Sequence, residues 1–219
     1  MSPEAPVLYG YWRSTAAYRV RIALNLKGLE WHYKSVHLVR DGGEQHAQGY
    51  RELNPAGLVP VLICQGQRIS QSLAIFEFLE EVYPQPALLP AAPGDRALVR
   101  ALAQDVACEI HPLNNLRVQQ YLGRELGADA TAREAWMHHW MAAGFETMQQ
   151  RLEQDGRAGD TCLGGAPGLA ELCLVAQAYN ADRFGFSLQP YPLLEHIVAH
   201  CRALPAFAAA APEQQPDAS

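Results

Sequence analysis

The sequence predicts an α/β domain followed by an all-helical domain, and three patterns in the chain point to this division. Strand-like and helix-like segments alternate over about the first 83 residues. A proline-rich stretch follows, and beyond it apolar residues recur only at helical spacing. A chain of 219 residues is long enough to bury a sizeable core.

The first domain, residues 1–84, is expected to have the element order βαβ-α-ββα. Apolar runs predict strands at 7–11 and 31–38, and a β-hairpin of 59–64 and 68–70 around Gln65-Gly66-Gln67. Amphipathic stretches predict helices at 15–27, 44–53 and 72–83, the first of them closed by Gly28. The βαβ crossover implies that the first two strands are parallel, and the hairpin adds antiparallel strands.

A linker is expected at residues 85–94, because Pro84, Pro86, Pro90 and Pro93 fall close together there. Residues 95–219 then show only helical periodicity, as in Val99, Leu102, Val106 and Ile110. This pattern predicts an all-α helical bundle. The polar tail from Pro212 is expected to fray.

Composition argues against several classes of function. A net charge of −6 with no basic run argues against nucleic-acid binding. We expect no membrane segment and no leader, because no apolar run is long enough to span a bilayer. The five cysteines form no C-x-x-C pair, so we expect neither a disulfide framework nor a metal site, and a reducing cytoplasm fits best.

The segment from Trp12 to Thr15 joins the first strand to the first helix and is the first candidate for chemistry. The Ser14 hydroxyl would lie at a helix N-terminus, among unpaired backbone N–H groups and at the positive end of the helix dipole. Such a position holds an anion, for example a thiolate, and Arg13 adds a guanidinium beside it.

Two further segments flank the hairpin, and each has two interpretations. Val59-Pro60 is either a cis peptide, which would offer the Val59 backbone to an extended peptide, or a trans proline on an edge strand. Ser72 is either a simple N-cap or part of a carboxylate site. Gln71 offers both a donor and an acceptor at the turn before it.

These motifs, in this order and at these separations, resemble the zeta class of glutathione transferases over about residues 7–217. The resemblance rests on the following segments: Arg13-Ser14 with Arg19-Val20-Arg21-Ile22-Ala23-Leu24, Asn54-Pro55, Val59-Pro60, Gln71-Ser72-Leu73-Ala74-Ile75, Leu88-Leu89-Pro90, Asn180-Ala181-Asp182-Arg183-Phe184, Pro190-Tyr191-Pro192 and Gln215-Pro216-Asp217. It implies a thioredoxin-like first domain, glutathione as cofactor and a homodimer. The implied activity is glutathione-dependent cis–trans isomerisation of maleylacetoacetate to fumarylacetoacetate, in aromatic amino acid catabolism.

The resemblance also implies roles for particular residues. Ser14 would favour the glutathione thiolate, and Arg13 and Arg183 would hold the two carboxylates of a small keto-acid substrate. Thr15 and nearby backbone N–H groups are candidates for stabilising negative charge on the ketone oxygen. The implied cofactor contacts are Ser14, Thr15, Gln45, Val59, Pro60, Gln71, Ser72, His111, Asn115 and Arg117.

The chain departs from the family pattern at two positions. Many zeta members have a cysteine where this chain has Ala16, so the nucleophilic thiol has to come from glutathione. Gly168 lacks the hydroxyl of the family's N-capping box, although Glu171 keeps the carboxylate. The alternatives are a maleylpyruvate isomerase of gentisate degradation, a broad-specificity glutathione transferase, and a non-catalytic binding protein on the same fold.

Overall fold

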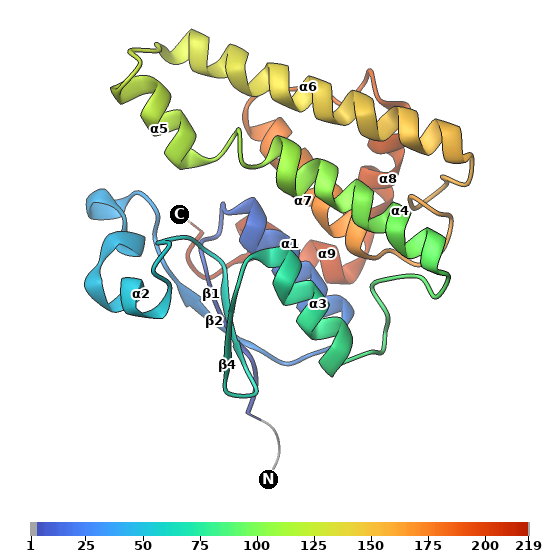
Figure 1. Ribbon diagram of the computed structural model, residues 1–219, viewed down its shortest axis with the longest axis horizontal. Helices are drawn as coiled ribbons and strands as arrows, with labels where there is room; N and C mark the ends of the chain where they lie inside the picture. Colours follow the sequence, from blue (N-terminus) through green and yellow to red (C-terminus); the bar gives the residue numbers. More distant parts are fainter. Residues whose placement is uncertain (1–3, 219) are drawn as a thin grey trace. The chain divides into compact units, whose positions relative to one another are not determined.

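The computed structural model describes residues 4–218 and divides them into two compact units (Figure 1). The first unit combines residues 4–88 with the C-terminal segment 203–218, and the second contains residues 89–202. The sequence instead places the whole segment after the linker in the helical domain. The C-terminal segment returns to the first unit because helix α9 (Pro205–Ala210) packs against helix α1 (Thr15–Leu26).

The first unit contains a four-stranded mixed sheet in the order β2-β1-β3-β4. Strand β1 (Val7–Gly10) pairs in parallel with β2 (His32–Ser35) and antiparallel with β3 (Val61–Cys64), which in turn pairs antiparallel with β4 (Gln67–Ser70). Helix α1 joins β1 to β2, α2 (Gln48–Leu53) precedes β3, and α3 (Ser72–Val82) follows β4. The predicted thioredoxin-like order βαβ-α-ββα is therefore confirmed.

Alternating residues of the strands face opposite sides of this sheet. Tyr9 and Val61 lie on the face that packs against Tyr50 and Leu53 of α2. The other strand residues include Leu8 and Leu62, which are fully buried, and α1 packs against α3. Helices therefore lie on both faces of the sheet.

Two local predictions in the first unit are wrong. The helix expected over 44–53 is split, because Ala47 has extended backbone angles (φ −62°, ψ 144°) between a 3-10 turn at Glu44–His46 and α2. The tail expected to fray from Pro212 is ordered, with a 3-10 turn at Pro212–Gln214. Gln215 is buried there and donates to the carbonyls of Ala209 (3.2 Å) and Ala211 (2.9 Å).

The second unit is helical, as predicted. Its elements are α4 (Pro93–Gln104), a π-helical segment η3 (Asp105–Ile110), α5 (Leu116–Arg124), α6 (Ala130–Asp155), α7 (Leu169–Arg183) and α8 (Pro192–Ala203). Helix α4 packs on α7, and η3 packs on α6. Pro93 begins α4 instead of lying in the expected linker, because a proline at the first helical position loses no intrahelical bond.

Within residues 4–218, no helix is long and apolar enough to cross a bilayer. The same residues contain no cluster of three or more His, Cys, Asp or Glu side chains that could bind a metal ion. All five cysteines are free thiols, and Cys108 is the exposed one.

Candidate functional site at one end of the sheet

Strand register brings the predicted site segments of the first unit to one end of its sheet. Gly10, the last residue of β1, pairs with Ser35, the last residue of β2. Val61, the first residue of β3, lies opposite Tyr9 and also opposite Ser70, the last residue of β4. The segments that leave β1, β2 and β4 and enter β3 therefore meet at this end. They contain Arg13, Ser14, Thr15, Gln45, Val59, Pro60, Gln71 and Ser72.

Ser14 is the N-cap of α1, as the sequence predicts. Its backbone is extended (φ −71°, ψ 114°), its carbonyl accepts the Tyr18 N–H (2.8 Å), and its Oγ accepts the Ala17 N–H (3.2 Å). A hydroxyl that accepts one hydrogen bond keeps its own proton to donate. The half-buried Ser14 can therefore donate to an anion at the positive end of the helix dipole, and Thr15 beside it is buried.

Arg13 is exposed, and its guanidinium carbon lies 4.0 Å from the centroid of the Trp12 ring. Trp12 itself is buried, and its carbonyl accepts a hydrogen bond from the buried Arg21 side chain (3.1 Å). Stacking on a fixed ring orients the charge of Arg13 without neutralising it. Arg21 therefore has a structural role here, as the donor of a hydrogen bond to a backbone carbonyl.

The Val59-Pro60 bond is cis, which resolves the alternative that the sequence left open. Strand β3 begins at Val61, two residues later than the strand predicted from the sequence. Val59 thus precedes the β-ladder, beside the end of the sheet where Ser14 lies. Its half-buried side chain packs against the cluster of Val36, Tyr50 and Val61.

Gln71, not Ser72, is the N-cap of α3, which excludes the first of the two interpretations of Ser72, a simple N-cap. Ser72 is the first helical residue and is buried. Gln71 has φ +70°, a left-handed conformation that costs free energy for a residue with a side chain. Such a conformation is often found at binding sites, and here it precedes the free N–H groups of a helix N-terminus.

Gln45 is buried in the 3-10 turn that follows the end of β2. Its Nε2 donates to the Leu38 carbonyl (3.2 Å), while its Oε1 is buried and has no hydrogen-bond partner among residues 4–218. Gly43 has φ +104°, and a Cβ there would collide with the Gln45 amide. The turn therefore holds an amide oxygen that can accept a hydrogen bond from a ligand.

The other four predicted site residues belong to the second unit. His111 follows η3, and its N–H bonds to the Val106 carbonyl (2.8 Å), five residues back, as in a π-helix. Asn115 is the N-cap of α5, and its Oδ1 accepts the N–H of the exposed Arg117 (3.2 Å). Arg183 is the exposed last residue of α7, with its guanidinium carbon 5.2 Å from the centroid of the Phe184 ring.

Sequence reasoning gave no role to Asp217, although it contacts the Ser14 loop. Its Oδ2 accepts the Trp12 N–H at 3.2 Å, across 205 positions of sequence. No local pattern could reveal this contact. The only signal was that Asp217 belongs to one of the motifs that carry the family resemblance.

Half of a capping box is present at the start of α7, as expected. The Glu171 carboxylate accepts the Gly168 N–H (2.7 Å), but Gly168 has no side chain to cap the helix. The second carboxylate oxygen accepts the Cys162 N–H (2.8 Å). These contacts tie the start of α7 to the loop before it and involve none of the predicted site residues.

Comparison with known proteins identifies the family. Residues 13–82 match the model for the N-terminal domain of glutathione S-transferases. The chain is 51% identical over 212 residues to the "Probable maleylacetoacetate isomerase" of Vibrio cholerae serotype O1, covering 97% of this chain and 98% of that one.

Two solved structures are also closely similar. One is the holo structure of a maleylpyruvate isomerase described as a bacterial zeta-class glutathione S-transferase (TM-score 0.94, 46% identity, 97% of this chain and 100% of that one). The other is a maleylacetoacetate isomerase from Methylobacterium extorquens AM1 with bound malonate and glutathione (TM-score 0.92, 38% identity, 97% and 99% covered). The chain belongs to the zeta class of the glutathione transferase family.

Proposed function

We propose that this protein is a glutathione-dependent isomerase that converts maleylacetoacetate to fumarylacetoacetate. The observation that carries the proposal is the position of the Ser14 hydroxyl, which caps α1 and keeps a proton to donate, at the sheet end where the predicted cofactor contacts of the first unit meet. Relatives that carry the name of this activity span nearly the whole chain.

The first unit fits glutathione at three points. The buried Gln45 Oε1 lacks a partner within the described residues and can accept an N–H of the tripeptide. Gln71 and Ser72, at the N-terminus of α3, suit the charged γ-glutamyl end. Val59, which precedes the ladder of β3, is proposed to pair with the cysteinyl backbone.

Bound glutathione supplies a thiolate that adds reversibly to the conjugated double bond of the substrate and so permits its rotation. The chain supplies the conditions for this chemistry. Ser14 donates a hydrogen bond to the sulfur, and the N-terminus of α1 adds positive potential, so that the thiolate is favoured over the thiol. Because the residue at position 16 is alanine, the loop contributes no thiol of its own.

Arg13 and Arg183 are proposed to bind the two carboxylates of the substrate. Both are exposed, and both stack near an aromatic ring of the neighbouring residue. Guanidinium groups stay charged at every relevant pH and can bind carboxylates with two hydrogen bonds. Holding both ends while the middle rotates restricts the reaction to isomerisation. His111, Asn115 and Arg117 are proposed as further contacts to glutathione.

Maleylpyruvate is the second candidate substrate. It offers the same cis double bond and two carboxylates on a shorter chain, and a maleylpyruvate isomerase is among the closely similar structures. Both candidates use the same set of residues, so only the length of the substrate distinguishes them.

One assay tests both candidates. The purified protein is mixed with each cis keto-acid, with and without glutathione, and the ultraviolet absorbance change is followed. We expect turnover of maleylacetoacetate that depends on glutathione. Faster turnover of maleylpyruvate would select the second candidate. Absence of turnover with both would refute the isomerase, and turnover without glutathione would refute the role given to the cofactor.

We also propose a homodimer in the cytoplasm. The dimer rests on family membership, and the location rests on five free thiols, four of them buried. Sedimentation of the purified protein tests the oligomeric state, and fractionation of cells tests the location.

A further inference from the structure

The C-terminal segment ends against the loop that carries Ser14. Asp217 Oδ2 accepts three hydrogen bonds, from the Trp12 N–H (3.2 Å), the Tyr33 hydroxyl (3.1 Å) and the Ser35 hydroxyl (2.8 Å). All of these residues belong to the first unit. One carboxylate oxygen therefore joins the tail to the β1–α1 loop and to β2.

Trp12 is the backbone anchor of this loop. Its N–H donates to Asp217, and its carbonyl accepts from Arg21 Nη2 (3.1 Å). The turn is closed by the Ser14 N–H, which donates to the Tyr11 carbonyl (2.9 Å). Both polar groups of the Trp12 backbone are thus held by side chains from elsewhere in the unit, and the peptide they fix lies two residues before Ser14.

The tail is itself fixed firmly enough to act as an anchor. Arg21 Nε donates to the Ala210 carbonyl (2.9 Å), and the buried Gln215 amide bonds back to Ala209 and Ala211. Burial and the adjacent Asp217 carboxylate raise the pKa of Tyr33, so its hydroxyl stays protonated and continues to donate. The acceptor of the Trp12 N–H therefore stays in one place.

We propose that Asp217 is a positioning residue of the active site, which holds the Trp12–Ser14 loop so that the Ser14 hydroxyl points at the glutathione sulfur. This proposal rests on the proposed function of Ser14. Asp217 acts through the backbone of Trp12. Its loss would move a hydroxyl whose hydrogen bond to the thiolate depends on placement within a fraction of an ångström.

The test compares Asp217→Ala and Asp217→Asn with Ser35→Ala. Ser35→Ala removes a donor from the same carboxylate oxygen and leaves the Trp12 contact intact, so it is the matched control. Each variant is saturated with glutathione, and the ultraviolet absorbance of the bound thiolate is followed against pH. This titration requires binding but no turnover, so it tests the positioning role even if the substrate assignment fails.

We expect Asp217→Ala to raise the pKa of the bound thiol and to lower kcat about tenfold, with a smaller change in the KM for glutathione. Ser35→Ala should match the wild type in both measurements. Asp217→Asn keeps an oxygen that can accept the Trp12 N–H, so its thiol pKa and kcat should lie between those of Asp217→Ala and the wild type. This variant provides the test if the alanine variant does not fold. A folded Asp217 variant, alanine or asparagine, with the wild-type thiol titration and kcat would overturn the proposal.

Discussion

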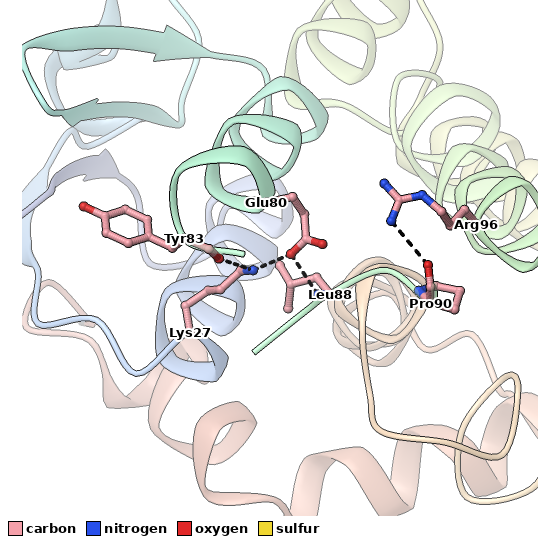
Figure 2. A network of polar contacts seen from close by, with 6 residues as sticks. All are labelled: Lys27, Glu80, Tyr83, Leu88, Pro90 and Arg96. Atoms are coloured by element: carbon pink, nitrogen blue, oxygen red, sulfur yellow. Dashed lines mark hydrogen bonds and ion pairs between the residues drawn. The ribbon is translucent and has the colours of Figure 1, made fainter. Parts of the chain in front are cut away.

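The pair formed by Lys27 and Glu80 provides the sharpest test of what stabilises the first unit. The Lys27 side chain is fully buried at the C-cap of α1, and it donates to a Glu80 carboxylate oxygen and to the Tyr83 carbonyl (2.7 Å) (Figure 2). The same Glu80 oxygen accepts the Leu88 N–H (2.8 Å). The ion pair thus joins the C-terminal ends of α1 and α3, and the Glu80 carboxylate also holds Leu88, the last residue of the unit's first segment.

Replacing Lys27 with methionine keeps the volume of the side chain and removes its charge. Breaking a buried pair from one side costs about 3–5 kcal/mol, because the remaining charge is left uncompensated. Glu80 keeps the Leu88 N–H and is 10% exposed, so we expect the lower end of this range, about 3 kcal/mol. A loss of this size is a large part of a stability of roughly 5–15 kcal/mol.

The double variant Lys27→Met/Glu80→Leu leaves no buried charge and should be more stable than Lys27→Met alone. Urea unfolding followed by circular dichroism measures each variant, with Lys34→Met as a control for losing an exposed lysine. The control should change the free energy of unfolding by no more than about 0.5 kcal/mol. The reasoning fails if Lys27→Met costs less than about 1 kcal/mol, or if the double variant costs the sum of the two single changes.

Ser14, Gly144 and the cysteines each give a further measurable outcome. Ser14→Ala should lower kcat about 100-fold and the free energy of unfolding by only about 1 kcal/mol, and wild-type turnover would exclude the proposed role. Alanine is usually a better helix former than glycine, yet Gly144→Ala should destabilise the protein by about 1–3 kcal/mol in thermal unfolding, because the new Cβ would overlap Ile110. A stabilised variant would contradict this packing. Burial, followed by the carboxylates nearby, raises the pKa of Cys201 from 9.0 to about 12. At pH 9, iodoacetamide should therefore modify the exposed Cys108 and leave Cys201 intact, as mass spectrometry would show, and equal labelling of the two would refute this. Between pH 9.0 and about 12 the Cys201 thiol ionises only in the unfolded chain, so the free energy of unfolding should fall across that range.

Most of the fold could be predicted because its signals are local. The apolar alternation of the strands and the amphipathic spacing of the helices survive in the structure within a few residues of the predicted limits. The prediction of one helix over 44–53 was wrong. The composition of this segment is compatible with a helix, but Ala47 adopts an extended conformation between two shorter elements. No residue in that segment signals the break.

The candidate site shows the same division between local and distant causes. The Ser14 cap could be predicted, since it depends on a hydroxyl at the start of a helical pattern. The left-handed Gln71 and the unpaired oxygen of Gln45 could not, because each depends on how the surrounding chain is held. By itself, each of these residues would favour another backbone conformation or a paired oxygen, so local sequence patterns predict something other than the structure observed.

The ordered C-terminal tail follows from the polar groups that it satisfies. Arg21 has a fully buried side chain on α1, and such a charge is stable only with hydrogen-bond partners. The Ala210 carbonyl supplies one of them, and the Asp217 carboxylate accepts the neighbouring Trp12 N–H. A chain ending before Ala210 would leave both α1 and the Ser14 loop without these partners, so the polar tail folds because the interior of the first unit requires its oxygens. Composition suggested fraying because the residues that require this tail lie nearly the whole chain length away.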